Sequence, residues 1–283
     1  VPTISNTTDT ILYLYYDNDH ADNPYINNSG VGNSVNVWDS NFMMVQHMTG
    51  ASYTALDDST SNNNDVASET ASPDYNQGGR CAKSVLFNSW DDEYLNVTDN
   101  DTLDGYTSGM TVEAWAYLDP MGDQSIHDDT IVGKYQTSGN ERAYYCQVYN
   151  ASRLQFAFSP DGTNRCGYEF TGQTYSMYIW YYLVFQWIPD QTPKAYCNGA
   201  QLTPDHISGG TTSSTINNAV TDLLIGNKIY DNEDFDGRID EIRISNNTRP
   251  ESWIDACYEV ERDETIDWFT EEMQDGGQPA SIT

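Results

Sequence analysis

The feature that most constrains the fold of this chain is a repeated alternation of short apolar runs with turn-forming residues. Runs of Val, Ile, Tyr, Phe and Trp are separated by clusters of Gly, Asn, Asp and Pro along most of the chain. Short runs at this spacing predict an antiparallel β-sandwich. We expect strands at residues 11–16, 42–48, 83–87, 94–97, 111–118, 130–135, 142–149, 154–158, 178–188, 195–197, 223–226 and 237–245. The Asn-Gly pair at 198–199 also predicts a hairpin turn, with its return strand at 201–202.

Burial can be predicted for two of these strands and for one helix. Residues 154–158 place Leu154 and every second residue after it on one face, as a half-buried strand does. The last strand breaks this alternation, and we expect a β-bulge near residues 240–241 to turn its three isoleucines inward. The predicted helix spans about residues 250–261, and its inner stripe comprises Trp253, Ile254, Cys257 and Tyr258.

The charge of the chain excludes several classes of partner. The formal net charge is −31, with only 12 Lys and Arg residues. No basic stripe is present to neutralise phosphates, so we expect no nucleic-acid partner. An anionic membrane surface would repel the chain, and no run of about twenty apolar residues suggests membrane insertion. The acidic excess favours bound or screening cations, Ca²⁺ among them.

A set of motifs, in a defined order, resembles one family of β-sandwiches. Residues 235–244 (FDGRIDEIRI) resemble its closing strand, and residues 110–115 (MTVEAW) resemble an earlier one. Further matching segments are residues 85–87, 91–95, 131–134, 195–199 and 224–227. Together they resemble the laminin-G-like, concanavalin A-like jelly rolls. The resemblance implies an all-β antiparallel sandwich with one short C-terminal helix, a cell-surface location and a binding or structural role without shared enzymatic activity.

The N-terminal part resembles a narrower group. Residues 8–16, 37–48 and 58–65 are similar to prokaryotic and archaeal surface proteins in which a small uncharacterised β domain precedes a laminin-G-like domain. We interpret residues 1–36 as the last strand of such a domain with a linker, 37–262 as the jelly roll, and 263–283 as an acidic extension. Because residue 1 is Val, we expect that an upstream segment was removed or lies outside this sequence.

An apolar strand without its own sheet needs another edge to pair with. It could insert into a second copy of the chain as a donor strand, which would build a filament or layer, or it could pair within its own sandwich. The candidate assembly residues are Ile11, Leu12, Tyr13, Leu14, Tyr15 and Tyr16.

Three aspartates are candidate ligands of a structural Ca²⁺. The family resemblance implies a calcium site near the closing strand, where Asp240 stands at the matching position. Asp91 and Asp92 would join it if the early and closing strands pair, since Ca²⁺ takes six to eight oxygen ligands. In the alternative, Asp240 and Glu241 accept hydrogen bonds from loop amides and nearby arginines.

The aromatic residues are candidates for glycan binding, and the acidic residues are candidates for catalysis. Exposed aromatic rings beside Asn and Asp can stack on sugars, although most Trp residues of a sandwich belong to its core. The candidates are Trp90, Trp180, Tyr149 and Tyr168. Glycosidases of this fold need two facing carboxylates, and their Glu-x-Asp-x-x-Glu spacing is missing from the sequence. The four His residues are isolated, so we expect no catalytic residues.

The cysteines favour disulfides, and the sequons permit glycosylation without demonstrating it. The five Cys residues lack zinc-ligand spacing, and we expect at least one disulfide with at least one thiol left over. Six sequons permit N-glycosylation: Asn6, Asn27, Asn96, Asn100, Asn150 and Asn246.

Together these features predict an extracellular or cell-surface structural or adhesive protein that self-assembles and holds a structural Ca²⁺. Its expected partners are further copies of itself, or surface glycans or proteins. A lectin-like glycan-binding module is the alternative, and a glycosidase of the same fold is the least favoured reading.

Overall fold

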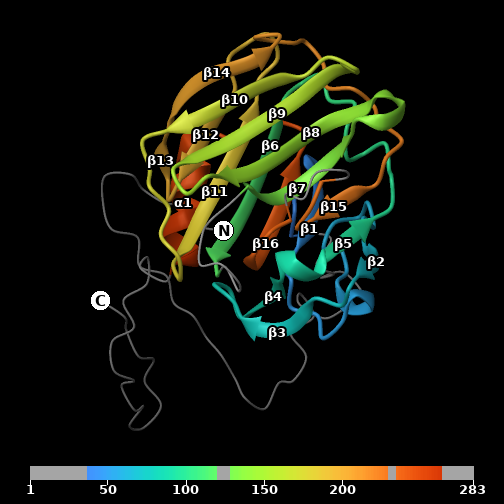
Figure 1. The fold of residues 1–283 in the computed structure, drawn as a ribbon, viewed down its shortest axis with the longest axis vertical. Helices are drawn as coiled ribbons and strands as arrows, with labels where there is room; N and C mark the ends of the chain where they lie inside the picture. The colour runs from blue at the N-terminus through green and yellow to red at the C-terminus, as the bar shows by residue number, and fades with distance from the viewer. Residues whose placement is uncertain (1–36, 120–127, 229–233, 263–283) are drawn as a thin grey trace, which may run out of the picture.

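The computed structural model describes residues 37–119, 128–228 and 234–262, which form two antiparallel sheets packed face to face (Figure 1). In spatial order, sheet A contains β13 (Ala200–Gln201), β12 (Lys194–Cys197), β11 (Trp180–Trp187), β6 (Met110–Leu118), β16 (Gly237–Ser245), β4 (Lys83–Phe87) and β3 (Asp74–Gly78), with β1 (Phe42–Gln46) also paired to β16. Sheet B contains β14 (Thr203–Gly209), β10 (Cys166–Thr171), β9 (Arg153–Gly162), β8 (Glu141–Tyr149), β7 (Asp128–Gln136), β15 (Leu223–Ile225), β5 (Tyr94–Val97) and β2 (Val66–Thr70).

The main core lies between the two sheets. Sheet A contributes side chains such as Leu183 and Phe185, and sheet B contributes Leu154, Phe156 and Phe158. All five are at most 1% exposed. Burying each of them stabilises the fold by roughly 1.5–3 kcal/mol relative to exposure. The alternation predicted for residues 154–158 is confirmed.

Most strands agree with the sequence prediction, and β4, β5 and β16 have the predicted bounds. Four strands were not predicted: β2, β3, β10 and β14. Strands β2, β3 and β14 are edge strands with few buried residues, so their apolar pattern is weak. Strand β10 does alternate, with Cys166, Tyr168 and Phe170 facing the core.

The predicted β-bulge in β16 is confirmed. The register with β6 shifts between Asp240 and Arg243, and Glu241 has a φ of 50°. Ile239, Ile242 and Ile244 are consequently all 0% exposed in the main core. On its other side, β16 pairs with β4 before the bulge and with β1 after it. The bulge therefore lies where two partner strands meet one edge.

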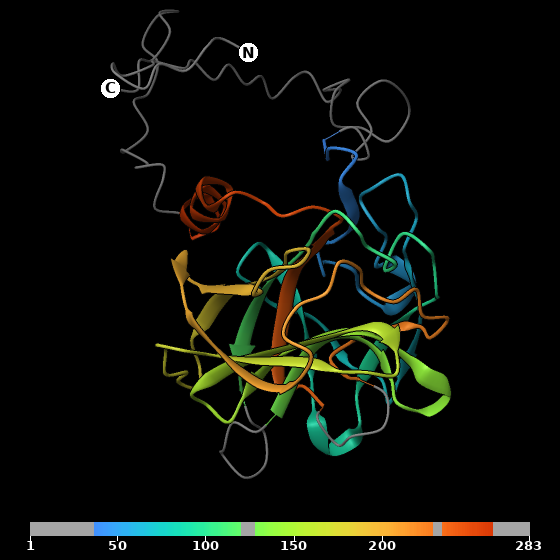
Figure 2. The ribbon, with the colours of Figure 1, turned by 90° about the horizontal axis from the view of Figure 1, so that it is seen from above.

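Helix α1 (Glu251–Glu261) covers the outer face of sheet A, on the side away from sheet B (Figure 2). It forms a second small core against Trp115 and Tyr182, in which Ile254 is fully buried. The inner stripe predicted for the helix is confirmed, since Trp253, Cys257 and Tyr258 pack there too. Three short 3-10 turns are η2 (Tyr53–Ala55), η3 (Ser89–Asp91) and η4 (Ser138–Asn140). Within the described residues, no helix has the length and apolar character needed to cross a membrane.

Candidate functional site

The outer face of sheet B carries a hollow of about 460 Å³ over its middle strands, here called the sheet B groove. Three cationic side chains and one carboxylate line it: Arg142, Arg165, Lys228 and Asp128. The other lining residues carry phenol, amide or hydroxyl groups: Tyr135, Tyr145, Tyr149, Gln147, Gln155, Thr137 and Thr163. The volume lies in the range of small-ligand sites.

Strand alternation explains why polar and aromatic groups gather here. Along β8, the side chains of Tyr144, Cys146 and Val148 point into the main core. The intervening Tyr145 and Gln147 therefore point outward, because successive side chains of a strand face opposite sides. The floor of the groove is the solvent side of a central strand whose other side is core.

A continuous set of hydrogen bonds among amide and phenol groups, with a cationic donor at each end, forms this floor. The Tyr145 hydroxyl donates to Gln155 Oε1 at 2.8 Å, and Gln147 Nε2 donates to the same atom at 3.2 Å. At one end, Lys228 Nζ donates to Gln147 Oε1 at 2.9 Å. At the other end, Arg165 donates to the Tyr145 hydroxyl. These bonds hold amide and hydroxyl groups in place beside two cations.

The cations also lie over the tyrosine rings. Lys228 Nζ is 3.8 Å from the ring centroid of Tyr145, and the Arg165 guanidinium carbon is 5.5 Å from the same centroid. Arg142 lies 5.9 Å from the centroid of Tyr135. Cation–π contacts of this kind fix a cation without neutralising its charge.

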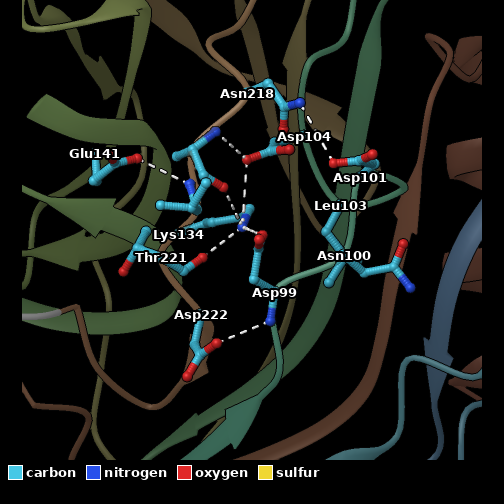
Figure 3. Close-up of polar contacts among 12 residues, drawn as sticks. Asp99, Asn100, Asp101, Leu103, Asp104, Lys134, Glu141, Asn218, Thr221 and Asp222 are labelled. Carbon is cyan, nitrogen blue, oxygen red and sulfur yellow. Dashed lines mark hydrogen bonds and ion pairs between the residues drawn. The ribbon is translucent and has the colours of Figure 1, made fainter.

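A buried lysine supports the loops beside this groove (Figure 3). Lys134 Nζ, on β7, donates to the carbonyls of Ala219 at 2.9 Å and of Thr221, and to Asp99. It also lies 3.3 Å from Asp104 Oδ2. Burial raises the pKa of Asp104 to about 6, and Lys134 opposes that rise. The lysine thus connects the loop after β5 with the segment that leads through β15 to Lys228.

A second group of charges lies under helix α1. Arg243 pairs with Glu241 at 2.9 Å, with Glu113 at 3.7 Å and with Glu261 of the helix. The bulge directs Glu241 toward His47, whose Nδ1 is 2.8 Å away. Burial raises the pKa of Glu261, whereas His47 and Arg243 hold the pKa of Glu241 below its usual value. The contacts join the helix to sheet A, so we assign them a structural role.

The three predicted calcium ligands are divided between two places. Asp240, 0% exposed on β16, accepts a hydrogen bond from the Cys81 amide at 2.7 Å. Asp91 ends η3, where it accepts from Asn88, and Asp92 follows it beside Asp234. In the described parts of the chain, no three His, Cys, Asp or Glu residues are grouped to hold a metal. The convergence of Asp91 and Asp92 with Asp240 is therefore wrong, and the loop-amide alternative describes Asp240. Burial raises the pKa of Asp240 to about 7.

The four predicted glycan-binding residues also lie apart. Tyr149 lines the groove. Trp90 is 69% exposed but belongs to η3, and Trp180 begins β11 in sheet A, against Tyr117. Tyr168 is a correction: it is 3% exposed in the main core, with its hydroxyl bonded to the Thr211 carbonyl, so no ring face is open to a sugar.

The expected disulfide is not formed, since all five cysteines carry free thiols. Cys146 on β8, Cys166 on β10 and Cys197 on β12 are buried at separate points of the sandwich. Burial raises the pKa of Cys197 to about 12. These thiols therefore behave as small apolar core groups.

Of the four sequons within the described residues, Asn150 is the exposed one, at the turn from β8 to β9. Asn96, Asn100 and Asn246 are partly exposed, and the Asn96 amide donates to Asp222 at 2.9 Å. Outside the described residues lie Asn6, Asn27 and the assembly residues Ile11, Leu12, Tyr13, Leu14, Tyr15 and Tyr16.

The cations and amides of the groove were not predicted from the sequence. The residues missed are Arg142, Arg165, Lys228, Gln147 and Gln155. One signal was available, because a central strand with large polar groups on its outward positions has a polar face to present. The contribution of Lys228, from a loop about eighty residues further along the chain than Gln147, carries no local signal.

The two antiparallel sheets packed face to face define an all-β jelly-roll domain. Residues 89–255 match the family model described as the concanavalin A-like lectin/glucanases superfamily. The chain belongs to this superfamily. No curated protein sequence shows significant similarity to it.

Several solved binding domains share the fold. The binding domain of Paraclostridial Mosquitocidal Protein 1 superposes with a TM-score of 0.59 at 16% identity, over 78% of this chain and 52% of that one. A botulinum neurotoxin type C structure, whose cell entry depends on interaction with two ganglioside molecules, gives 0.55 at 15% identity, over 78% and 51%. The binding domain of botulinum neurotoxin DC in complex with SialylT gives 0.55 at 11% identity, over 79% and 52%. The chain thus spans about half the length of each.

Proposed function

We propose that this protein is an extracellular binding module that recognises a surface glycan in the sheet B groove. The observation that carries the proposal is the groove itself, a hollow whose floor is a fixed set of amides and phenols. Sugars offer many hydroxyl groups, which need paired donors and acceptors when they leave water. Thr137, Thr163 and Tyr149 present such groups at the exposed part of the groove, above the buried amides of Gln147 and Gln155.

The comparisons support this class of partner. Chains with the same fold are binding domains of toxins, one dependent on gangliosides and one bound to SialylT. Binding of a surface glycan is also an adhesive function of the kind that the sequence predicts.

The lining of the groove favours binding over hydrolysis. Among the described residues that line it, Asp128 is the one carboxylate. Glycosidases use two carboxylates on either side of the scissile bond, roughly 5–10 Å apart. A single carboxylate beside three cations is suited to holding a sugar, not to cleaving it.

Tyr149 provides the test, with Trp90 as its control. We expect Tyr149→Ala to weaken glycan binding about threefold to tenfold, the usual contribution of one aromatic contact. Trp90→Ala removes a more exposed ring outside the groove and should leave binding unchanged. The measurement is a glycan array followed by titration calorimetry of the best oligosaccharide. Absence of binding to every glycan, or a loss with Trp90→Ala and none with Tyr149→Ala, would refute the proposal.

A further inference from the structure

We infer that the ligand of the sheet B groove is an acidic glycan, whose carboxylate or sulfate is held by Arg165 and Lys228; this inference rests on the proposed function. The groove contains three of the protein's 12 basic residues, in a chain of net charge −31. Among the described residues that line the groove, cationic side chains therefore outnumber the one carboxylate, whereas acidic residues far outnumber basic ones in the chain as a whole. A local cationic site on an acidic protein selects for a small anionic group.

The bonds of the arginines inside the protein leave their charge available. Arg165 donates to the neutral Tyr145 hydroxyl, and Arg142 donates to the carbonyls of Gly162 and Thr163. The Nε of Arg165 is buried and has no hydrogen-bond partner.

Lys228 and Arg165 also approach the same ring. Both lie over Tyr145, at 3.8 Å and 5.5 Å from its centroid. An anionic group placed beside both cations would be attracted to each of them. A carboxylate or sulfate group provides two or three oxygens for charge-assisted bonds to both.

Two glycines make room for these cations on the sheet. A Cβ added at Gly167 would lie 3.2 Å from Arg165 Nε and 2.7 Å from Ser208 Oγ. A Cβ added at Gly133 would lie 2.7 Å from Lys228 Cβ. Each cation therefore lies across a strand position without a side chain. A residue with a side chain there would displace the cation from the groove.

The neutral groups explain why the anion should be part of a sugar. Gln147 and Gln155 form the floor between the two cations, and Thr137 and Thr163 add hydroxyls to the lining. A free phosphate or sulfate ion would use the cations alone. An acidic sugar would use the cations and also offer hydroxyls to the exposed Thr137 and Thr163.

The test uses matched acidic and neutral probes: sialyllactose with lactose, and trigalacturonate with its carboxyl-reduced form. We expect the wild-type protein to bind the acidic member of at least one pair about tenfold or more tightly, as charge-assisted bonds allow. Arg165→Gln and Lys228→Gln should each reduce that preference about tenfold. Gly167→Ala should reduce it without changing the charge. Arg153→Gln is the control, because Arg153 lies on the neighbouring β9, outside the groove, and pairs with Glu169.

The outcomes separate this inference from the proposed function. Thermal unfolding of each variant shows whether it is folded, and Gly167→Ala offers a second route if Lys228→Gln is not. Equal binding of acidic and neutral members, with Tyr149→Ala weakening both, overturns the acidic ligand and keeps glycan binding. Loss of the acidic preference with Arg153→Gln, equal to that with Arg165→Gln, also overturns it. If no pair and no array glycan binds, both the inference and the proposed function are wrong.

Discussion

Replacing Lys134 by methionine should destabilise the protein by about 3–5 kcal/mol at pH 7, the usual cost of removing one partner from a buried ion pair. Methionine has a similar length but no charge. The side chains of Lys134 and Asp104 are both 0% exposed, whereas Asp99 is 29% exposed and can turn to water. Asp104 should contribute at most about 1.4 kcal/mol of this cost at pH 7, because a carboxyl with a pKa of about 6 can take up a proton once its cation is gone. The rest should come from Asp99 and from the carbonyls of Ala219 and Thr221, which lose their donor (Figure 3).

The pH dependence follows from the pKa of Asp104. Its folded pKa of about 6 lies above the ordinary 3.8. The contribution of Asp104 to stability is therefore fully present below about pH 4 and is lost as pH rises through 6. Without Lys134 this pKa rises further, so the loss continues to higher pH. We expect the cost of Lys134→Met to be smaller at pH 5 than at pH 8.

Urea unfolding at pH 5, 7 and 8 measures these differences. Lys134→Met combined with Asp104→Asn should be more stable at pH 7 than Lys134→Met alone. Lys83→Met removes an exposed lysine and should change stability by less than about 0.5 kcal/mol. A cost below about 1 kcal/mol at all three pH values, or no gain from Asp104→Asn, would refute this account of the buried lysine.

Four further predictions concern other parts of the molecule. Since burial raises the pKa of Asp240 to about 7, its ionisation should lower the free energy of unfolding by about 3 kcal/mol between pH 5 and 8. Asp240→Asn should flatten this pH dependence in urea unfolding, and an unchanged pH dependence would contradict the assignment. If Asp240 is a Ca²⁺ ligand, added Ca²⁺ should raise the Tm of the wild type and not of Asp240→Asn, and an equal rise in both would exclude that role. Arg243→Met should cost about 3–5 kcal/mol, because three carboxylates under helix α1 lose their shared cation; a loss near zero in the same assay would show that they do not depend on it. Deleting residues 1–17 should abolish any large assemblies seen by light scattering, and assemblies that persist would rule out the predicted donor strand.

The strands with a buried face could be predicted from the sequence. The break in alternation at Ile239 predicted the bulge in β16, because strict alternation would have exposed an isoleucine. The edge strands β2, β3 and β14 could not be predicted, since they contribute little to the core and their order comes from pairing with neighbours. For these strands, tertiary context outweighs local pattern.

The site could be predicted only in part. Tyr149 was found because it is an aromatic residue next to a turn and a sequon, but Tyr168 has the same residue type and belongs to the core. Arg165 and Lys228 come from a turn and a loop far apart in the chain. They meet over Tyr145 because β7 to β10 pair in order within sheet B. Only the sheet topology brings these two cations together.

The structure of the protein with its best-binding oligosaccharide is the most direct test of the central claim. The account predicts that the sugar lies on the outer face of β8 and β9, in contact with Tyr149 and Thr163, with any acidic group beside Arg165. A sugar bound elsewhere, for example against the exposed Trp90 of η3, with the groove empty, would contradict it.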